Sequence, residues 1–131
     1  MPMAIFIILV LGGMALTIAR YTSQASTASF QEIMNVQAFY AAESGAQYGM
    51  NQLFYDETQA MTQALALANC AALVSPPTFS GAGLQNCTAT VSCNSTLVSG
   101  VRYFSIESVG QCGVGSPYSA LRTLNVSSFV E

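Results

Sequence analysis

The sequence predicts an α+β fold in which one long N-terminal helix packs on a small antiparallel sheet of about three strands. A second, short helix follows the long helix in the chain and precedes the strands. Three observations predict this fold. Residues 1–55 contain one proline, Pro2, and are rich in good helix formers. Residues 86–131 alternate apolar and polar side chains, as strands do, and all four cysteines lie in the second half of the chain. A length of 131 residues allows one domain with an appendage.

The N-terminus is an uncharged apolar run, and the first charged residue is Arg20. About 50 helical residues would reach roughly 75 Å, more than the diameter of so small a domain, so we expect residues 1–20 to be the apolar, protruding half of the helix. This run is just long enough to span a bilayer. Its expected assembly and membrane residues are Ile5, Phe6, Ile7, Ile8, Leu9, Val10, Leu11, Gly12, Gly13, Met14 and Leu16.

Two features of the run refine this expectation. No basic residue precedes it, which argues against a secretory signal peptide. The Gly12-Gly13 pair costs about 1 kcal/mol per glycine in helix propensity and is the predicted point of local unwinding.

Residues 21–131 are expected to form the globular part, which includes the second half of the long helix. After a small, polar stretch, apolar residues recur on one broad helical face at three- and four-residue spacing. The residues predicted to pack this helix against the sheet are Phe30, Ile33, Met34, Tyr40 and Tyr48.

The second helix is expected to begin at Asp56, with Gln59 completing a capping box, and to end before Ser75-Pro76-Pro77. Strands are predicted over NCTATVSC, RYFSIESVG and ALRTLNVSSFV, with turns in NSTLVSG and CGVGSP. The loops at Pro76–Gln85 and Asn94–Gly100 are where an exposed ligand site would be sought.

The chain has four cysteines, Cys70, Cys87, Cys93 and Cys112. They predict two disulfides that form in an oxidising compartment. Three pairings are possible. A simple hairpin turning near residue 97 would place Cys112 closer to Cys87 than to Cys93, which favours Cys87–Cys112 with Cys70–Cys93, although a longer loop would reverse this. The chain has no histidine and no close cysteine pair, so we expect no zinc, no other metal and no cofactor.

Charged residues make up 7% of the chain, with a net charge of −3, three arginines and no lysine. Nucleic acid is therefore not a predicted partner. So few charges suit either a subunit covered by its neighbours or a monomer coated in Ser, Thr, Asn and Gln. The chain also lacks a phosphate-binding glycine loop and a nucleophile elbow, so we predict that it is not an enzyme.

Three stretches resemble a known family. The segment AFYAAESGAQYGMNQLF (Ala38–Phe54) resembles the helix of MshP-type minor pilins of the mannose-sensitive haemagglutinin pilus and, more loosely, of PilX-like minor pilins. The stretch YFSIESVGQCGVGSPYSALRTLNVS (Tyr103–Ser127) is similar to the same family's S-x-G-x-C-G turn, arginine and closing strand. PMAIFIILVLGG is similar too, and together the three cover about half of the chain.

The resemblance implies a type IV pilin-like structural subunit. It would be made as a prepilin, trimmed by a prepilin peptidase and held in the bacterial inner membrane. The pilus assembly machinery would then extrude it into an extracellular filament with other pilin subunits, apolar helices inside and sheets outside, with a role in surface attachment. Alternatives are a minor pseudopilin of a type II secretion system and a membrane-anchored periplasmic binding module.

The chain departs from the family pattern at three points. It shows no basic leader ending in glycine, so we expect it to be the mature form or slightly shortened. Met3 or Ala4 stands where these pilins carry a glutamate at the fifth mature position. The proline that often kinks the pilin helix near position 22 is also missing. The missing glutamate fits a minor or tip subunit better than an ordinary repeating one.

Overall fold

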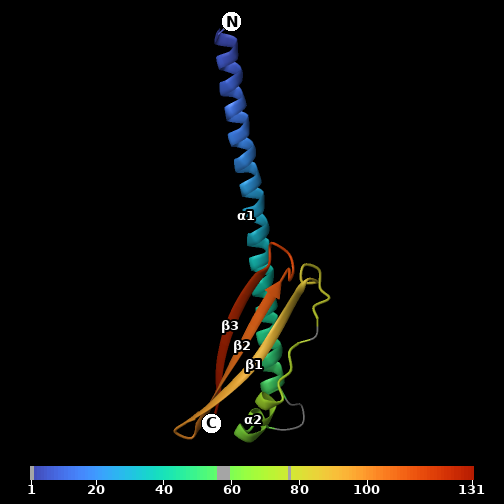
Figure 1. The fold of residues 1–131 in the computed structure, drawn as a ribbon. Helices are drawn as coiled ribbons and strands as arrows, with labels where there is room; N and C mark the ends of the chain where they lie inside the picture. The colour runs from blue at the N-terminus through green and yellow to red at the C-terminus, as the bar shows by residue number, and fades with distance from the viewer. Residues whose placement is uncertain (1, 56–59, 77) are drawn as a thin grey trace. The chain divides into compact units, whose positions relative to one another are not determined.

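A computed structural model describes residues 2–55, 60–76 and 78–131 (Figure 1). The expected α+β fold is confirmed: a long N-terminal helix, a short second helix and a three-stranded antiparallel sheet. In chain order the elements are α1 (Pro2–Phe54), α2 (Gln63–Ala71), β1 (Cys87–Val98), β2 (Val101–Cys112) and β3 (Ala120–Val130).

The chain divides into two compact units, residues 1–33 and residues 34–131. We call the second one the head. The N-terminal unit consists of the first part of α1, which continues without interruption through Gly12 and Gly13. The unwinding predicted at this pair is therefore absent. Helix propensity alone does not break a helix when the neighbouring residues on both sides are strong helix formers.

The sheet of the head has the order β1-β2-β3. Val98 pairs with Val101, so only Ser99 and Gly100 form the first turn, and both have positive φ (51° and 87°). Positive φ at both central residues is typical of the tight hairpin turn whose twist matches that of its strands. The prediction of an exposed loop at Asn94–Gly100 is therefore wrong, because β1 extends to Val98.

Small residues of α1 face the sheet. The buried positions of the helix are Ala38, Ala41, Ala42, Gly45, Ala46, Gly49 and Leu53. A Cβ atom at Gly45 would overlap Ser108 Oγ and lie 2.8 Å from the Ala89 Cβ, and one at Gly110 on β2 would overlap the backbone of Ala38 and Ala42. Helix and sheet thus approach closely because α1 presents alanine and glycine at the contact and Gly110 of β2 lies against its backbone.

The predicted packing face is wrong in its main members. Tyr40 is 55% exposed, and Phe30 and Ile33 are each 53% exposed, whereas Met34 and Tyr48 are half-buried. The large side chains were favoured because they offer the most apolar area to bury. At close helix–sheet distance, however, the contact surface accepts only small side chains.

The bulky part of the core lies at the C-terminal end of α1, where Leu53, Val91, Phe104 and Ile106 are buried together with Ala66 and Cys70 of α2. The Phe54 ring meets the Phe104 ring edge-on, with 6.0 Å between their centroids. A second buried cluster at the other end of the sheet contains Ala38, Ala41, Cys87, Cys112 and Ala120. The two clusters bracket the small-residue contact.

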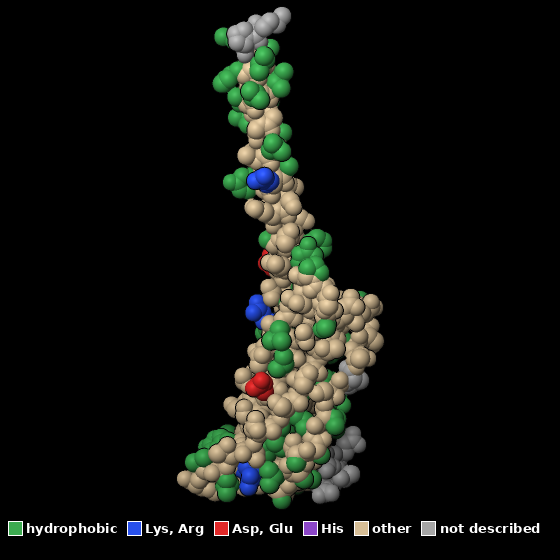
Figure 2. Space-filling model, in the orientation of Figure 1, with side chains coloured by type: hydrophobic (Ala, Val, Ile, Leu, Met, Phe, Trp, Pro, Cys, Tyr) green, Lys and Arg blue, Asp and Glu red, His purple; other side chains and the backbone are tan. Residues whose placement is uncertain are grey.

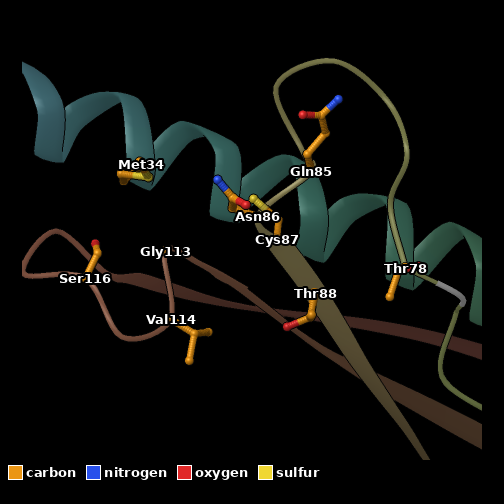
Figure 3. Close-up of a pocket in the computed structure, with 9 residues that line it drawn as sticks. All are labelled: Met34, Thr78, Gln85, Asn86, Cys87, Thr88, Gly113, Val114 and Ser116. Carbon is orange, nitrogen blue, oxygen red and sulfur yellow. The ribbon is translucent and has the colours of Figure 1, made fainter.

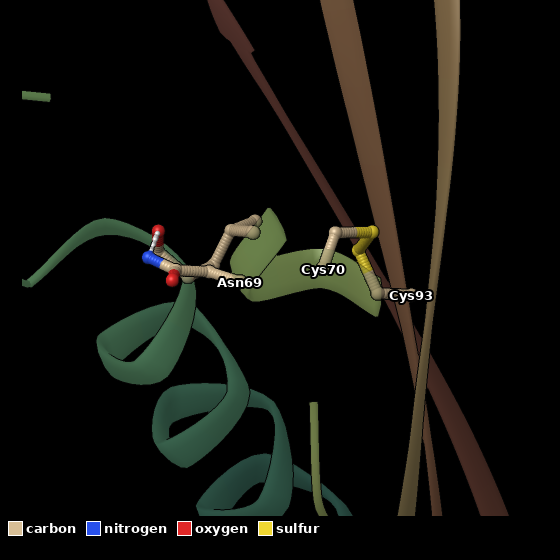
Figure 4. Close-up of a disulfide and its surroundings, with 4 residues drawn as sticks. Asn69, Cys70 and Cys93 are labelled. Atoms are coloured by element: carbon tan, nitrogen blue, oxygen red, sulfur yellow. Dashed lines mark hydrogen bonds between the residues drawn. A yellow bond between two sulfur atoms is a disulfide. The ribbon is translucent and has the colours of Figure 1, made fainter. Parts of the chain in front are cut away.

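Two disulfides tie these elements together, Cys70–Cys93 and Cys87–Cys112. This is the pairing that the hairpin geometry favoured, since Cys87 lies directly opposite Cys112 on β1 and β2. The first bridge holds α2 against β1 (Figure 4), and Asn69 beside it donates a hydrogen bond to the Leu53 carbonyl at 3.1 Å. The C-terminal end of α2 is therefore fixed to both α1 and the sheet.

The N-terminus of α2 differs from the expected one. The helix begins at Gln63, and the Thr62 hydroxyl caps it by accepting from the Leu65 N–H at 3.3 Å. Asp56 and Gln59, the expected capping pair, lie outside the described residues. The helix end agrees with the proline signal, since α2 stops at Ala71, ahead of Pro76.

Candidate assembly segment and head surfaces

The most unusual surface of the chain is the apolar part of the N-terminal unit, which we call the assembly segment (residues 3–19). Its large side chains are exposed, from 40% at Val10 to 82% at Met3. Figure 2 shows hydrophobic side chains along it. The sequence has no acidic or basic residue before Arg20. A soluble protein rarely leaves so continuous an apolar surface in water, so this segment requires a cover of lipid or protein.

Length and composition support that interpretation. The segment belongs to a helix long and apolar enough to cross a membrane, with a mean hydropathy of 2.2 in its most apolar window and none of that window buried. A core helix of a soluble protein would also be apolar, but it would be buried. The first turn of α1 holds no acidic residue, as the sequence indicates.

Hydroxyl side chains within the assembly segment and just after it donate hydrogen bonds to carbonyls of their own helix. Thr17 donates to the Met14 carbonyl at 2.8 Å and Thr22 to the Ile18 carbonyl at 3.0 Å. Thr27 and Ser29 donate in the same way to carbonyls four residues earlier. Because these hydroxyls are satisfied within the helix, they can enter an apolar environment at less cost than free ones.

A pocket with a volume of about 540 Å³ lies in the head (Figure 3). Its lining comes from α1, from β1, from the loop before β1 and from the loop between β2 and β3. The lining residues are Met34, Thr78, Gln85, Asn86, Cys87, Thr88, Gly113, Val114 and Ser116. None of these is a carboxylate, a base or a free thiol, since Cys87 is in a disulfide. The pocket therefore offers neutral hydrogen-bonding groups and no acid–base pair.

The described residues contain no group of three or more side chains that could hold a metal ion. In the expected loop at Pro76–Gln85, the described residues are irregular and mostly exposed, but Phe79 and Leu84 pack against the second core cluster. This loop therefore covers one end of the head.

Most of the exposed positions on the outer face of the sheet carry polar side chains. Exposed positions on it include Thr88, Thr90, Ser92, Asn94, Thr96, Ser105, Glu107, Thr123, Asn125 and Ser127. At one end, Tyr103 and Phe129 stand opposite each other with 6.0 Å between their ring centroids. Uncharged polar side chains thus predominate among the exposed positions of this face.

The long apolar N-terminal helix predicted from the sequence is confirmed, but the residues by which α1 contacts the sheet were missed. The signal was present: Ala38, Ala42, Gly45 and Gly49 recur at four- and three-residue spacing, which puts them on one helical face. A search for large apolar residues passes over such a stripe.

Comparison of the chain with protein-family models, with curated proteins and with solved structures finds no match. The fold and the surfaces described above are therefore the basis for a functional proposal.

Proposed function

We propose that this protein is a structural subunit of a type IV pilus or a related filament. The observation that carries the proposal is the exposed, uncharged assembly segment, which continues as the same helix into a disulfide-bonded α+β head. In this role the segment first lies in the inner membrane and is then transferred to a bundle of the same segments from other subunits. Both environments are apolar, so one set of side chains serves both.

The two disulfides of the head also support the proposal. The Cys70–Cys93 bridge joins residues that are 23 positions apart, and the Cys87–Cys112 bridge joins residues that are 25 positions apart. Disulfides of this kind persist where the surroundings are oxidising. The neutral polar outer face of the sheet would remain in contact with water once the subunits assembled. The resemblance of Ala38–Phe54 and Tyr103–Ser127 to MshP-type minor pilins points to the same class.

A membrane-anchored binding module is the second candidate, because a single helix that can span a membrane is also what a permanent anchor requires. The two candidates differ in where the segment ends up. An anchor stays in lipid, whereas a filament subunit leaves the membrane and can be sheared from the cell surface. A pseudopilus subunit would likewise leave the membrane without forming long surface filaments.

The test replaces Leu11, which is 61% exposed in the middle of the segment, by aspartate. A central aspartate costs about 2.5–3.5 kcal/mol on membrane-insertion scales, and in a helix bundle its charge would be unpaired. We expect Leu11→Asp to be missing from filaments sheared off the cell surface, as measured by electron microscopy and mass spectrometry of that material.

The matched control is Thr90→Asp, which adds the same charge to the exposed outer face of β1. We expect this variant to enter filaments normally. Recovery of the wild-type chain only in the membrane fraction, never in sheared filaments, would contradict the filament proposal and favour the anchor. Filaments of Leu11→Asp indistinguishable from the wild type would show that the segment is not buried on assembly.

A further inference from the structure

The two edge strands of the sheet, β1 and β3, differ in how far other parts of the chain cover them. The β1 edge is covered: the Val91 N–H donates to the Ser75 Oγ at 3.1 Å, and the Cys70–Cys93 disulfide holds α2 beside the strand. Figure 1 shows α2 and the described part of the segment between α2 and β1 on this side of the sheet. The backbone groups of β1 are therefore partly hidden from other chains.

The β3 edge has no such cover. Within the described residues, β3 pairs with β2 alone, and its eleven residues contain no proline and no lysine. Natural proteins usually protect an edge of this length, because its free N–H and C=O groups are a template for another strand. Beside the edge, a groove of about 260 Å³ is lined by Glu43, Ala46, Gln47 and Met50 of α1 and by Leu124 and Val126 of β3.

The sequence of β3 is symmetric in polarity about its centre. ALRTLNVSSFV reads, from either end, as two apolar residues, two polar ones, one apolar one and then the central Asn125. An antiparallel copy of β3 centred on Asn125 would therefore place Leu121 opposite Phe129 and Leu124 opposite Val126. Arg122 would face Ser128, and Thr123 would face Ser127. Every opposing pair is either apolar on both sides or polar on both sides.

From the open edge and this symmetry we propose that β3 is a self-association edge, which pairs antiparallel with β3 of a second copy of the chain to make one continuous six-stranded sheet. Directly opposite residues on paired strands share a face and are in contact, so matched polarity stabilises the pairing. Leu121 and Phe129, which are 54% and 58% exposed in the single chain, would cover each other. Leu124 and Val126 of the second copy would extend the apolar lining of the groove.

The proposed register is specific. A shift of two residues in one direction places Leu121 opposite Glu131 and Leu124 opposite Ser128, and a shift in the other direction places Arg122 opposite Val126 and leaves Phe129 outside the pairing. A shift of one residue would turn inner side chains to the outer face. Only the register centred on Asn125 matches polarity along the full strand.

This inference goes beyond the proposed function and does not depend on it. Antiparallel pairing about a twofold axis joins two heads of opposite direction. In a filament whose subunits all point the same way, such a contact would connect two filaments. It would not connect successive subunits of one filament.

The test uses the full chain in detergent with a single added cysteine. All four native cysteines are in disulfides, so the new thiol is the only free one. Asn125→Cys would face its own copy across the twofold axis, within the reach of a disulfide. In Thr123→Cys the two thiols would be four residues apart along the strands, about 13 Å, which is too far. With the oxidant diamide we expect several-fold more covalent dimer from Asn125→Cys.

Mixing Thr123→Cys with Ser127→Cys provides a second check, since these positions face each other across the pair. We expect a mixed covalent dimer in several-fold excess over the dimers that either variant forms alone. Equal cross-linking of Asn125→Cys and Thr123→Cys would overturn the register, and no cross-linking of either would overturn the pairing. Association through the assembly segment would not distinguish the two positions, so it cannot imitate the expected result.

A charge exchange tests the same register without cysteine. Thr123→Glu with Ser127→Glu would place like charges opposite each other twice, whereas Thr123→Glu with Ser127→Lys would place opposite charges there. Both positions are exposed on the outer face, so both variants should fold. In an Asn125→Cys background, we expect the first pair to reduce cross-linking several-fold and the second to retain it. The same loss in both variants would contradict the proposal.

Discussion

The two parts of helix α1 differ in the size of the side chains that they bury. In residues 3–33 the large apolar side chains are exposed, with Leu9 at 69% and Phe30 at 53%. In residues 34–54 the buried positions are mainly alanine and glycine, and Leu53 is the one large side chain among them that is fully buried. Side-chain size, more than hydrophobicity, therefore distinguishes the part of the helix that packs within its own chain from the part that does not.

The comparison explains why the chain is so apolar and yet has a modest core. The head obtains its close helix–sheet contact from small residues and concentrates its bulky core at Leu53, Phe104 and Ile106. Much of the remaining apolar surface lies on the assembly segment, where nothing within the described chain covers it. Burial of that surface is left to the surroundings, which is the physical basis of the proposed assembly.

The largest expected effect comes from removing a buried leucine. Leu53→Ala should lower the free energy of unfolding of the head by about 2–5 kcal/mol, because it leaves a cavity among Val91, Phe104 and Ile106. The measurement is urea unfolding of the full chain in detergent, followed by near-ultraviolet circular dichroism of the tyrosines.

The same substitution at Leu11 is the matched control, since it lies in the same helix but is 61% exposed. Leu11→Ala should change the unfolding free energy of the head by no more than about 0.5 kcal/mol. A loss at Leu11 comparable to that at Leu53 would show that the two parts of α1 do not differ as described.

A smaller effect is expected from adding a methyl group at the helix–sheet contact. Gly45→Ala should destabilise the head by about 1–3 kcal/mol, because the new Cβ would overlap Ser108 Oγ and approach the Ala89 Cβ to 2.8 Å. Gly12→Ala, with nothing within 4 Å of the new atom, should cause no such loss. Denaturant midpoints of both variants measure the difference, and a Gly45→Ala head as stable as the wild type would mean that the contact is looser.

The smallest effect is expected on the exposed side of the packed half of α1. Tyr40→Ala removes a ring that is 55% exposed and meets Phe39 edge-on with 6.1 Å between the centroids. We expect a change in unfolding free energy of about 0.5 kcal/mol or less, measured by the same urea titration. A loss of 2 kcal/mol or more, as for a core aromatic, would restore the packing role that the sequence predicted for this residue.

Several features could be predicted because they depend on local pattern. The apolar run, the alternation in the three strands and the turn residues each identify an element without knowledge of its neighbours. The hairpin also led to the Cys87–Cys112 pairing, because residues on adjacent antiparallel strands have fixed partners once the turn is placed. The cap at Thr62 was missed because Asp56, an acidic residue that also suits a helix N-cap, lies six residues earlier in the sequence.

The sequence by itself determined that the chain has a long helix with an uncharged apolar end, a meander of three strands and enough cysteines for two bridges. These follow from propensity, periodicity and composition, which are properties of single segments. Only the tertiary structure decided which side of α1 meets the sheet, how far β1 extends, and which edge of the sheet remains open. Those features depend on the distance between segments, since a close contact selects Ala38, Gly45 and Gly110 and leaves Tyr40 outside.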